Sequence, residues 1–395
     1  MTEEERYQGP PPMIRPGPLP WQQQPWPVPP WQVQPVPWQR PPGPQPPPWQ
    51  QPPPWQQPRP PWGPPVPPDV RWAPPPGTLP HDVPRPFLLA MRSRDWAWWR
   101  PVLGLLLVVV VFSVLSVIAV VAGMVGLVAT QGISALPEGA DLDLIDPGIL
   151  LLVNASLIVA IPVVWMAWAV AHGMRIGWSS SVLGRFRWRL LLPYALIALG
   201  TLGTGIGLSV LVGFLVGGED ITGPVSSFGW LLAVVLLTTP LQSAAEEYLF
   251  RGYLSQAIAG WIGAPRAGAV ITAVFTATLF SLVHLPPDWP TFLDRFAFGL
   301  AASAVVWLTG GLEAAVVLHA ANNVLVFTLA GALGDGVATD EVPAGAGPWM
   351  LLLSLLSMAA YVALVARSGR RVRPETVTAA QDLRFPGLPV PVPAA

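Results

Sequence analysis

Two adjacent carboxylates and a guanidinium lie in the middle of a long apolar stretch of the sequence. Glu246 and Glu247 are followed by Arg251, four residues after Glu247. Residues four apart share one face of a helix, so Glu247 and Arg251 can form an ion pair, whereas Glu246 projects about 100° away. A structural ion pair that holds two helices together explains one carboxylate only. Glu246 remains, and an unpaired carboxylate in an apolar segment is the arrangement expected of a general base.

Imidazole and amide side chains occur in two later apolar stretches. Phe280 and His284 end one stretch, and His319 and Asn323 lie one helical turn apart in the other. Each pair alone also has a structural interpretation, because a histidine near a helix end is often a satisfied polar residue and polar side chains hydrogen-bond between membrane helices. Together with Glu246, the two imidazoles could polarise a water molecule that attacks a carbonyl carbon.

The composition places these groups in a membrane protein. The chain has 395 residues, of which 52% are hydrophobic and 11% charged, whereas soluble domains have about 25% charged residues. All 21 cationic residues are Arg, and a net charge of -1 provides no basic field for nucleic acid. The chain has no Cys, which excludes disulfides, iron-sulfur clusters and thiol nucleophiles.

Eight apolar stretches predict an all-α membrane protein with about eight transmembrane helices, in a membrane domain at 89–373. Most are long enough to cross a hydrocarbon core of about 30 Å at about 1.5 Å per residue. We expect the spans at 101–130, 149–172, 190–217, 228–262, 267–286, 292–309, 312–331 and 348–366.

The charged residues between the spans predict the orientation. Arg residues gather in linkers on one side, at Arg175, Arg185, Arg187, Arg189, Arg367, Arg370, Arg371 and Arg373. The alternate linkers are acidic, with Glu138, Asp141, Asp143, Asp146, Glu219, Asp220, Asp335, Asp340 and Glu341. By the positive-inside rule both termini are cytoplasmic. The Lys-free composition is typical of a high-GC bacterial coding sequence, so we expect the plasma membrane of a bacterium.

The terminal regions have a different composition. Residues 1–88 are rich in Pro, Gln and single Trp residues, which predicts a disordered, semi-extended cytoplasmic tail. It could be a spacer or a ligand for a partner that binds Pro-rich motifs. Residues 374–395 are expected to form a second cytoplasmic tail.

Three motifs resemble those of a known family. They are Glu246-Glu247-x-x-x-Arg251, Phe280-x-x-x-His284 and His319-x-x-x-Asn323, in this order on successive spans. They are similar to the motifs of the CPBP family, the CAAX-protease and bacteriocin-processing intramembrane endopeptidases, whose members include the type II CAAX prenyl endopeptidases. The resemblance covers about residues 228–330.

The resemblance implies a protease or hydrolase that cleaves a membrane-associated peptide or protein in a cytoplasm-facing cavity of the bilayer. It implies that Glu246 activates water, that His284 assists or binds a metal, and that His319 and Asn323 complete the site. The supporting residues are Glu247, Arg251 and Phe280. We expect this site about 10–15 Å from the cytoplasmic face, counted at 1.5 Å per residue.

The metal content remains open at this point. Glu246, His284 and His319 could form an open catalytic zinc site of a metalloendopeptidase. The same residues would also serve a metal-free, glutamate-type protease.

Two functions from other classes use the same sequence features. The Glu and His residues could form the proton relay of a membrane transporter, or an inactive scaffold could act through the Pro/Trp tail. Transporters commonly contain internal repeats, and no second Glu-Glu or His-x-x-x-Asn element occurs in the apolar stretches of the other half of the chain. This favours the protease. The residues select no particular substrate.

Overall fold

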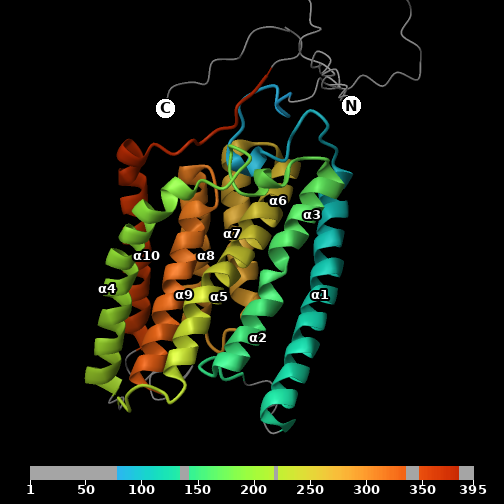
Figure 1. Cartoon of the computed structure of the whole chain (residues 1–395). Helices are drawn as coiled ribbons and strands as arrows, with labels where there is room; N and C mark the ends of the chain where they lie inside the picture. The colour runs from blue at the N-terminus through green and yellow to red at the C-terminus, as the bar shows by residue number, and fades with distance from the viewer. Residues whose placement is uncertain (1–77, 134–141, 218–220, 335–346, 382–395) are drawn as a thin grey trace, which may run out of the picture. The chain divides into compact units, whose positions relative to one another are not determined.

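The computed structural model describes residues 78–133, 142–217, 221–334 and 347–381. Among these residues, eight helical segments are long and apolar enough to cross a membrane, which confirms the predicted all-α membrane fold. The helices, shown in Figure 1, are α1 (Trp99–Gln131), α2 (Pro147–Ile158), α3 (Ala160–His172), α4 (Leu191–Gly217), α5 (Phe228–Glu247), α6 (Ser255–Ile262), α7 (Pro265–Val283), α8 (Trp289–Thr309), α9 (Glu313–Leu333) and α10 (Gly347–Val372). α2 and α3 together make one span, and α5 and α6 make another.

The span that contains α5 and α6 is continuous but not uniform. It runs for 35 residues, and a π-helical segment, Tyr248–Leu254, joins the two α-helices. This segment begins directly after Glu247. π-helical turns inside α-helices are rare and are frequent at functional sites. The irregular segment therefore marks the part of the span where the paired carboxylates lie.

Helix α8 begins at a sharp break in the chain after α7. The side chain of Asp288 accepts a hydrogen bond from Thr291 N at 2.7 Å, and Pro290 lies in the first turn of α8. A capping carboxylate and a proline in the first turn both favour a helix start. His284 is the C-cap residue of α7, directly after Val283, and therefore lies at the junction of two helices.

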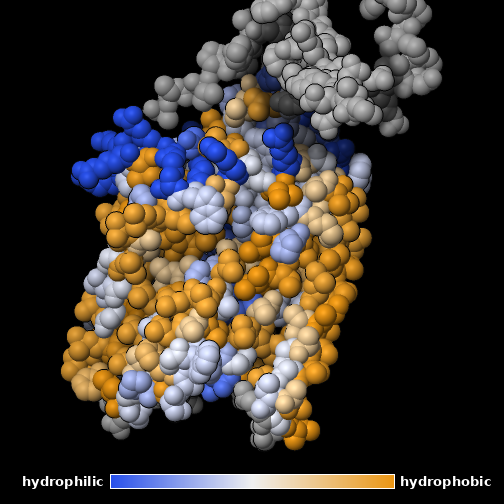
Figure 2. Space-filling model, in the orientation of Figure 1, coloured by the Kyte–Doolittle hydropathy of each residue, from blue (hydrophilic) through white to orange (hydrophobic). Residues whose placement is uncertain are grey.

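The surface of the bundle matches a membrane environment. Figure 2 shows an apolar surface along the flank of the helices and a hydrophilic band at one end. The exposed cationic residues of this end include Arg175, Arg185, Arg189, Arg370 and Arg371. Arg189 Nη1 donates to the carbonyl of Val372 at 3.0 Å, so the linker before α4 and the end of α10 lie on the same side. The two predicted Arg-bearing regions therefore meet, as the sequence indicated.

Residues 78–91 pack on this same end of the bundle. The packed part of the chain therefore begins before the predicted end of the tail at residue 88. Phe87, Leu89 and Met91 belong to the main hydrophobic core and are at most 2% exposed. His81 Nε2 hydrogen-bonds with Ala90 O at 2.7 Å, and burial lowers the pKa of its imidazole. The Pro-rich composition of the region conceals a short apolar run, Phe87 to Met91, that is sufficient for packing.

The described part of the second tail also packs on the bundle. Thr378 is fully buried, and its backbone N donates to Arg85 O at 2.8 Å. The predicted boundary at 374 therefore differs from the structure as well. Residues 1–77 and 382–395 of the two predicted tails, with the Pro-rich partner motif, lie outside the described residues.

Of the acidic linker residues, Asp143 and Asp146 are described. The side chain of Asp146 caps α2 by accepting from Gly148 N at 2.8 Å and from Ile149 N at 2.9 Å. The remaining seven lie outside the described residues: Glu138, Asp141, Glu219, Asp220, Asp335, Asp340 and Glu341.

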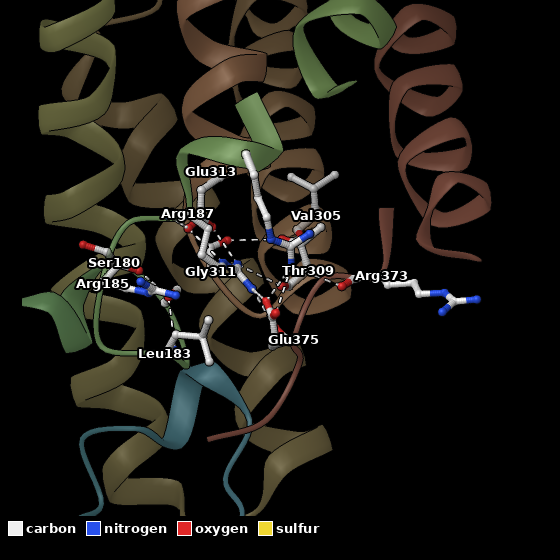
Figure 3. Close-up of polar contacts among 12 residues, drawn as sticks. Ser180, Leu183, Arg185, Arg187, Val305, Thr309, Gly311, Glu313, Arg373 and Glu375 are labelled. Atoms are coloured by element: carbon white, nitrogen blue, oxygen red, sulfur yellow. Dashed lines mark hydrogen bonds and ion pairs between the residues drawn. The ribbon is translucent and has the colours of Figure 1, made fainter. Parts of the chain in front are cut away.

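A buried ion pair ties this end of the bundle together (Figure 3). Arg187 Nη2 lies 2.6 Å from Glu313 Oε2, and Arg187 Nε lies 2.9 Å from Glu313 Oε1. The same guanidinium donates to the carbonyls of Thr309 at 3.0 Å and Glu375 at 2.8 Å. One side chain thus joins the linker before α4, the turn between α8 and α9, and the segment after α10. Gly311 is required beside it, because a Cβ atom there would lie 2.3 Å from Arg187 Nη2.

We expect Arg187→Ala to destabilise the protein strongly. The change would leave Glu313, which is 0% exposed, as an unpaired charge, at a cost of about 3–5 kcal/mol. Arg189→Ala is the matched control, because Arg189 is 50% exposed and its pair with Glu375 contributes at most about 1 kcal/mol. Thermal melting of both variants in detergent measures the difference, and equal melting temperatures would contradict the structural role of Arg187.

Candidate active site

Helices α5, α7 and α9 bring the three sequence motifs into one place. Glu246 Oε2 lies 3.7 Å from His284 Nε2 and 3.8 Å from His319 Nε2. Glu246 is 7% exposed and His319 is 3% exposed, so the carboxylate and one imidazole are shielded almost completely. The helix packing explains this convergence, since α5 contacts α9 along its length and α7 follows α6 directly in the chain.

The second nitrogen of each imidazole has its own partner. His284 Nδ1 lies 2.6 Å from the carbonyl oxygen of Phe280, and His319 Nδ1 lies 3.0 Å from Glu247 Oε1. Both partners accept hydrogen bonds, so they select the tautomer that carries its proton on Nδ1 and leaves a lone pair on Nε2. The two lone pairs and Glu246 Oε2 therefore face one another. At separations of 3.7 and 3.8 Å these atoms are too far apart for direct hydrogen bonds.

The predicted ion pair between Glu247 and Arg251 is present and fully buried. Arg251 Nη1 donates to Glu247 Oε1 at 2.9 Å, and both side chains are 0% exposed. Arg251 Nη2 donates to the carbonyl of Gly299 at 2.9 Å, which connects this span to α8. Glu247 also accepts the hydrogen bond from His319, a contact that the sequence spacing did not indicate. The ion pair thus orients one of the imidazoles as well as joining helices.

Gly299 has a steric role that the sequence did not indicate. A Cβ atom at this position would lie 2.7 Å from the Cα atom of Ala277, closer than packed atoms allow. The missing side chain lets α8 approach α7 closely, so that the Gly299 carbonyl reaches Arg251. The sequence signal that could have indicated this close helix contact is a glycine within an otherwise helical pattern.

Phe280 packs between the two imidazoles. Its ring centroid lies 4.5 Å from that of His284 and 5.8 Å from that of His319, and its side chain is 3% exposed. Phe298 stacks on the same ring at 5.7 Å with an interplanar angle of 17°. These rings restrict the rotation of both imidazoles, which accounts for Phe280 in the motif. Phe298 was missed by the sequence analysis.

Asn323 is connected to Glu246 through an intermediate residue. Asn323 Nδ2 donates to Gln242 Oε1 at 3.3 Å, and Gln242 Nε2 donates to Glu246 Oε1. Gln242 was also missed, although it precedes Glu246 by four residues and therefore shares its helix face.

The other two histidines lie outside this cluster. His172 Nε2 hydrogen-bonds with the hydroxyl of Tyr253 at 2.9 Å near the end of α3, and His81 binds Ala90 as described. Both imidazoles have structural partners that explain their burial.

The cluster opens into a cavity of about 350 Å³. The polar lining includes Gln242, Glu246, His284, Asp294, Arg295, His319, Asn322 and Asn323. The apolar lining includes Leu144, Leu150, Val153, Leu157, Phe280, Phe298, Phe327 and Met358. The cavity is therefore large enough for several side chains, and its polar groups come from several different helices.

The lining also shows towards which end of the bundle the cavity extends. Leu144 and Leu150 lie at the beginning of α2, and Asp294 and Arg295 lie near the beginning of α8. These helix ends are opposite to the Arg-bearing end, where α3 and α8 finish and residues 78–91 form a packed cover. The lining does not support the predicted cytoplasm-facing cavity, because it reaches away from the end that the Arg residues assign to the cytoplasm.

The donor atoms lie slightly further apart than the ligands of a bound zinc ion. Zinc held at about 2.0–2.1 Å by three tetrahedral donors keeps those donors roughly 3.3 Å apart. The observed separations from Glu246 are 3.7 and 3.8 Å. Within the described ranges, no group of three or more His, Cys, Asp or Glu side chains is arranged to hold a metal ion.

Comparisons with known proteins agree with the motifs. Residues 228–325 match the family described as Type II CAAX prenyl endopeptidase Rce1-like. A segment of 108 residues is 32% identical to the uncharacterized protein YyaK of Bacillus subtilis (strain 168), and covers 26% of this chain and 34% of YyaK. The chain thus matches about a third of the length of that relative. No solved structure matches the chain significantly. The segment that carries all three motifs, residues 228–325, is thus similar to the Rce1-like type II CAAX prenyl endopeptidases.

Proposed function

We propose that this multi-pass membrane protein is an intramembrane endopeptidase that hydrolyses a peptide bond with a Glu246-activated water molecule. One observation carries the proposal: a buried carboxylate oxygen and two imidazole lone pairs face one another on the wall of a cavity. Three hydrogen-bond acceptors at this spacing suit a water molecule that donates to two of them and turns its oxygen lone pair towards the cavity.

The reaction follows from this arrangement. Glu246 Oε2 accepts one hydrogen of the water and His284 Nε2 accepts the other, so the water oxygen is oriented to attack the carbonyl carbon of the substrate. As the new carbon–oxygen bond forms, the proton moves to Glu246. When the carbon–nitrogen bond breaks, Glu246 returns this proton to the leaving amine, and the carboxylate is regenerated.

The remaining residues hold this geometry and stabilise the developing charge. Glu247 fixes the tautomer of His319, and the Glu247–Arg251 pair fixes the position of Glu247. Asn323 uses one of its two amide hydrogens for Gln242 and has a second one for the oxyanion. Preorganised donors of this kind are usually the largest contribution to catalysis.

The direction of the cavity bears on how the substrate arrives. With the Arg-bearing end in the cytoplasm of a bacterium, as the positive-inside rule predicts, the cavity extends towards the outer half of the bilayer. A substrate would then be a membrane-associated peptide or protein segment that reaches the site from the outer side or laterally from the lipid. The apolar lining suits a segment with apolar side chains.

The orientation can be tested by cysteine labelling on this Cys-free background. We expect Ala264→Cys, between α6 and α7, to react with an impermeant maleimide from the cytoplasmic side only. Ile221→Cys, before α5, is expected to react from the outside; Ala264 is exposed and Ile221 is 53% exposed. Gly263 and Gly334 are poorer positions, because a Cβ atom there would lie 2.5 Å from Arg92 Nη1 and 1.9 Å from Thr222 Oγ1. Labelling of both variants from one side would contradict the predicted topology.

The function itself is tested by a cleavage assay. Purified protein in detergent is incubated with a library of apolar peptides, and the products are identified by mass spectrometry, with Glu246→Gln as the inactive control. The proposal expects new amine and carboxyl termini with the wild type only. Intact peptides throughout, or the same products from the control, would contradict it.

A further inference from the structure

We propose that Gln242 is a positioning residue of the active site, which holds the base Glu246 in the orientation that catalysis requires. None of the three sequence motifs described above contains this residue. The inference rests on the proposed function, because it assigns a role in the reaction of the same site. It is argued from the hydrogen bonds and burial of Gln242, which lies one helical turn before Glu246 on α5.

The first observation is the direct contact between the two side chains. Gln242 Nε2 donates to Glu246 Oε1, and the amide is 6% exposed, so the contact is shielded from solvent. Glu246 has two carboxylate oxygens, and this bond occupies one of them. The other, Oε2, is the atom that faces His284 and His319. Gln242 thus determines which oxygen is presented to the reacting groups.

The second observation is that Gln242 is itself held in place. Its Oε1 accepts hydrogen bonds from Asn323 Nδ2 at 3.3 Å and from Ser243 Oγ at 3.3 Å. Asn323 is in turn bound by Asn322, whose Nδ2 donates to Asn323 Oδ1 at 3.2 Å. These donors require the oxygen of Gln242 to point away from Glu246 and its NH₂ group to point towards it. A flipped amide would place two acceptors against each other.

These contacts hold Glu246 in one conformation, through the carboxylate oxygen that does not face the imidazoles. A glutamate side chain in a cavity would otherwise sample several rotamers. Gln242 touches the base and acts through it, so its loss should affect the chemical step more than substrate binding.

The test compares two variants with a matched control. Gln242→Met keeps the length of the side chain and removes the donor, and Gln242→Asn keeps an amide but shortens its reach. Gln256→Met is the control, because Gln256 is equally buried in the same span and bonds to Trp178 O and Gly252 O outside the cavity. We expect both Gln242 variants to lose about 10²-fold in kcat with KM within about twofold of wild type. Gln256→Met should lose stability without losing kcat.

A second measurement does not depend on turnover. Hydrophobic carbodiimides react with carboxyl groups that they can reach, and Glu246 is 7% exposed while Gln242 holds it. Release from this contact should make Glu246 more accessible, so it should be labelled several-fold faster in Gln242→Met than in wild type, as read by tandem mass spectrometry. If either folded Gln242 variant keeps the wild-type kcat, or if the labelling rates are equal, the inference is wrong while the proposed function stands. If the wild type cleaves no peptide, the proposed function is wrong. The labelling comparison still decides whether Gln242 positions Glu246, because faster labelling of Gln242→Met supports this role and equal labelling contradicts it.

Discussion

Replacing Glu246 by Gln is expected to lower kcat by about 10²–10⁴-fold, the usual contribution of a general base. A Gln side chain has the shape of Glu and can still accept the hydrogen bond from Gln242, so the fold should be kept. Its amide cannot take a proton from water at neutral pH, so the attacking oxygen is no longer activated. The change therefore removes the chemical step while leaving the cavity in place. Cleavage rates of purified variants, with thermal melting for folding, provide the measurement.

Glu375→Gln is a suitable control for this change. It makes the same substitution at a carboxylate that lies at the Arg-bearing end of the bundle, beside Arg187 and Arg189 and outside the cavity. We expect this variant to keep the wild-type kcat. Full activity of Glu246→Gln would reject Glu246 as the base.

Arg251→Ala is expected to destabilise the protein strongly. The change leaves Glu247, which is 0% exposed, as an unpaired charge in an apolar environment, at a cost of about 3–5 kcal/mol. It also removes the hydrogen bond to the Gly299 carbonyl, and with it a link between the π-helical segment and α8. Both the folded yield and the activity should fall. The melting temperature in detergent measures the first, and an unchanged value would contradict the importance of the pair.

The double variant Glu247→Gln with Arg251→Gln tests whether Glu247 has a structural role or is itself the general base. Two neutral amides can still hydrogen-bond, so folding should recover. The oxygen of Gln at position 247 can still accept from His319 Nδ1, which keeps the imidazole oriented. Some activity should therefore return, because Glu246 is unchanged. Recovered folding without activity would instead make Glu247 the base.

Much of this arrangement could be predicted from the sequence. The spacing of four between Glu247 and Arg251 and the order of the three motifs predicted the ion pair and the convergence of Glu246 with two imidazoles. Long apolar stretches predicted all eight spans, because hydropathy over about 20 residues is the dominant signal in membrane proteins. These features depend on local composition and on helix periodicity, which a single sequence contains.

Other features depend on tertiary contacts that no local pattern records. The link from His319 to Glu247 joins two helices, and the π-helical segment after Glu247 has no sequence signal of its own. Residues 78–91 pack on the bundle because Phe87, Leu89 and Met91 are part of the hydrophobic core. The average composition of the Pro-rich region did not indicate this packing. The direction in which the cavity extends likewise depends on how the helix ends pack. From the sequence, only the depth of individual residues along each span can be estimated.

The most direct test of the central claim is cleavage in water enriched in ¹⁸O. Wild-type protein and Glu246→Gln are incubated with the same peptide in detergent, and the new carboxyl terminus of the product is weighed by mass spectrometry. Hydrolysis by an activated water predicts one solvent oxygen in that carboxyl group with the wild type, and no product above background with the variant. Product without solvent oxygen, or labelled product at equal rates from both proteins, would contradict the account.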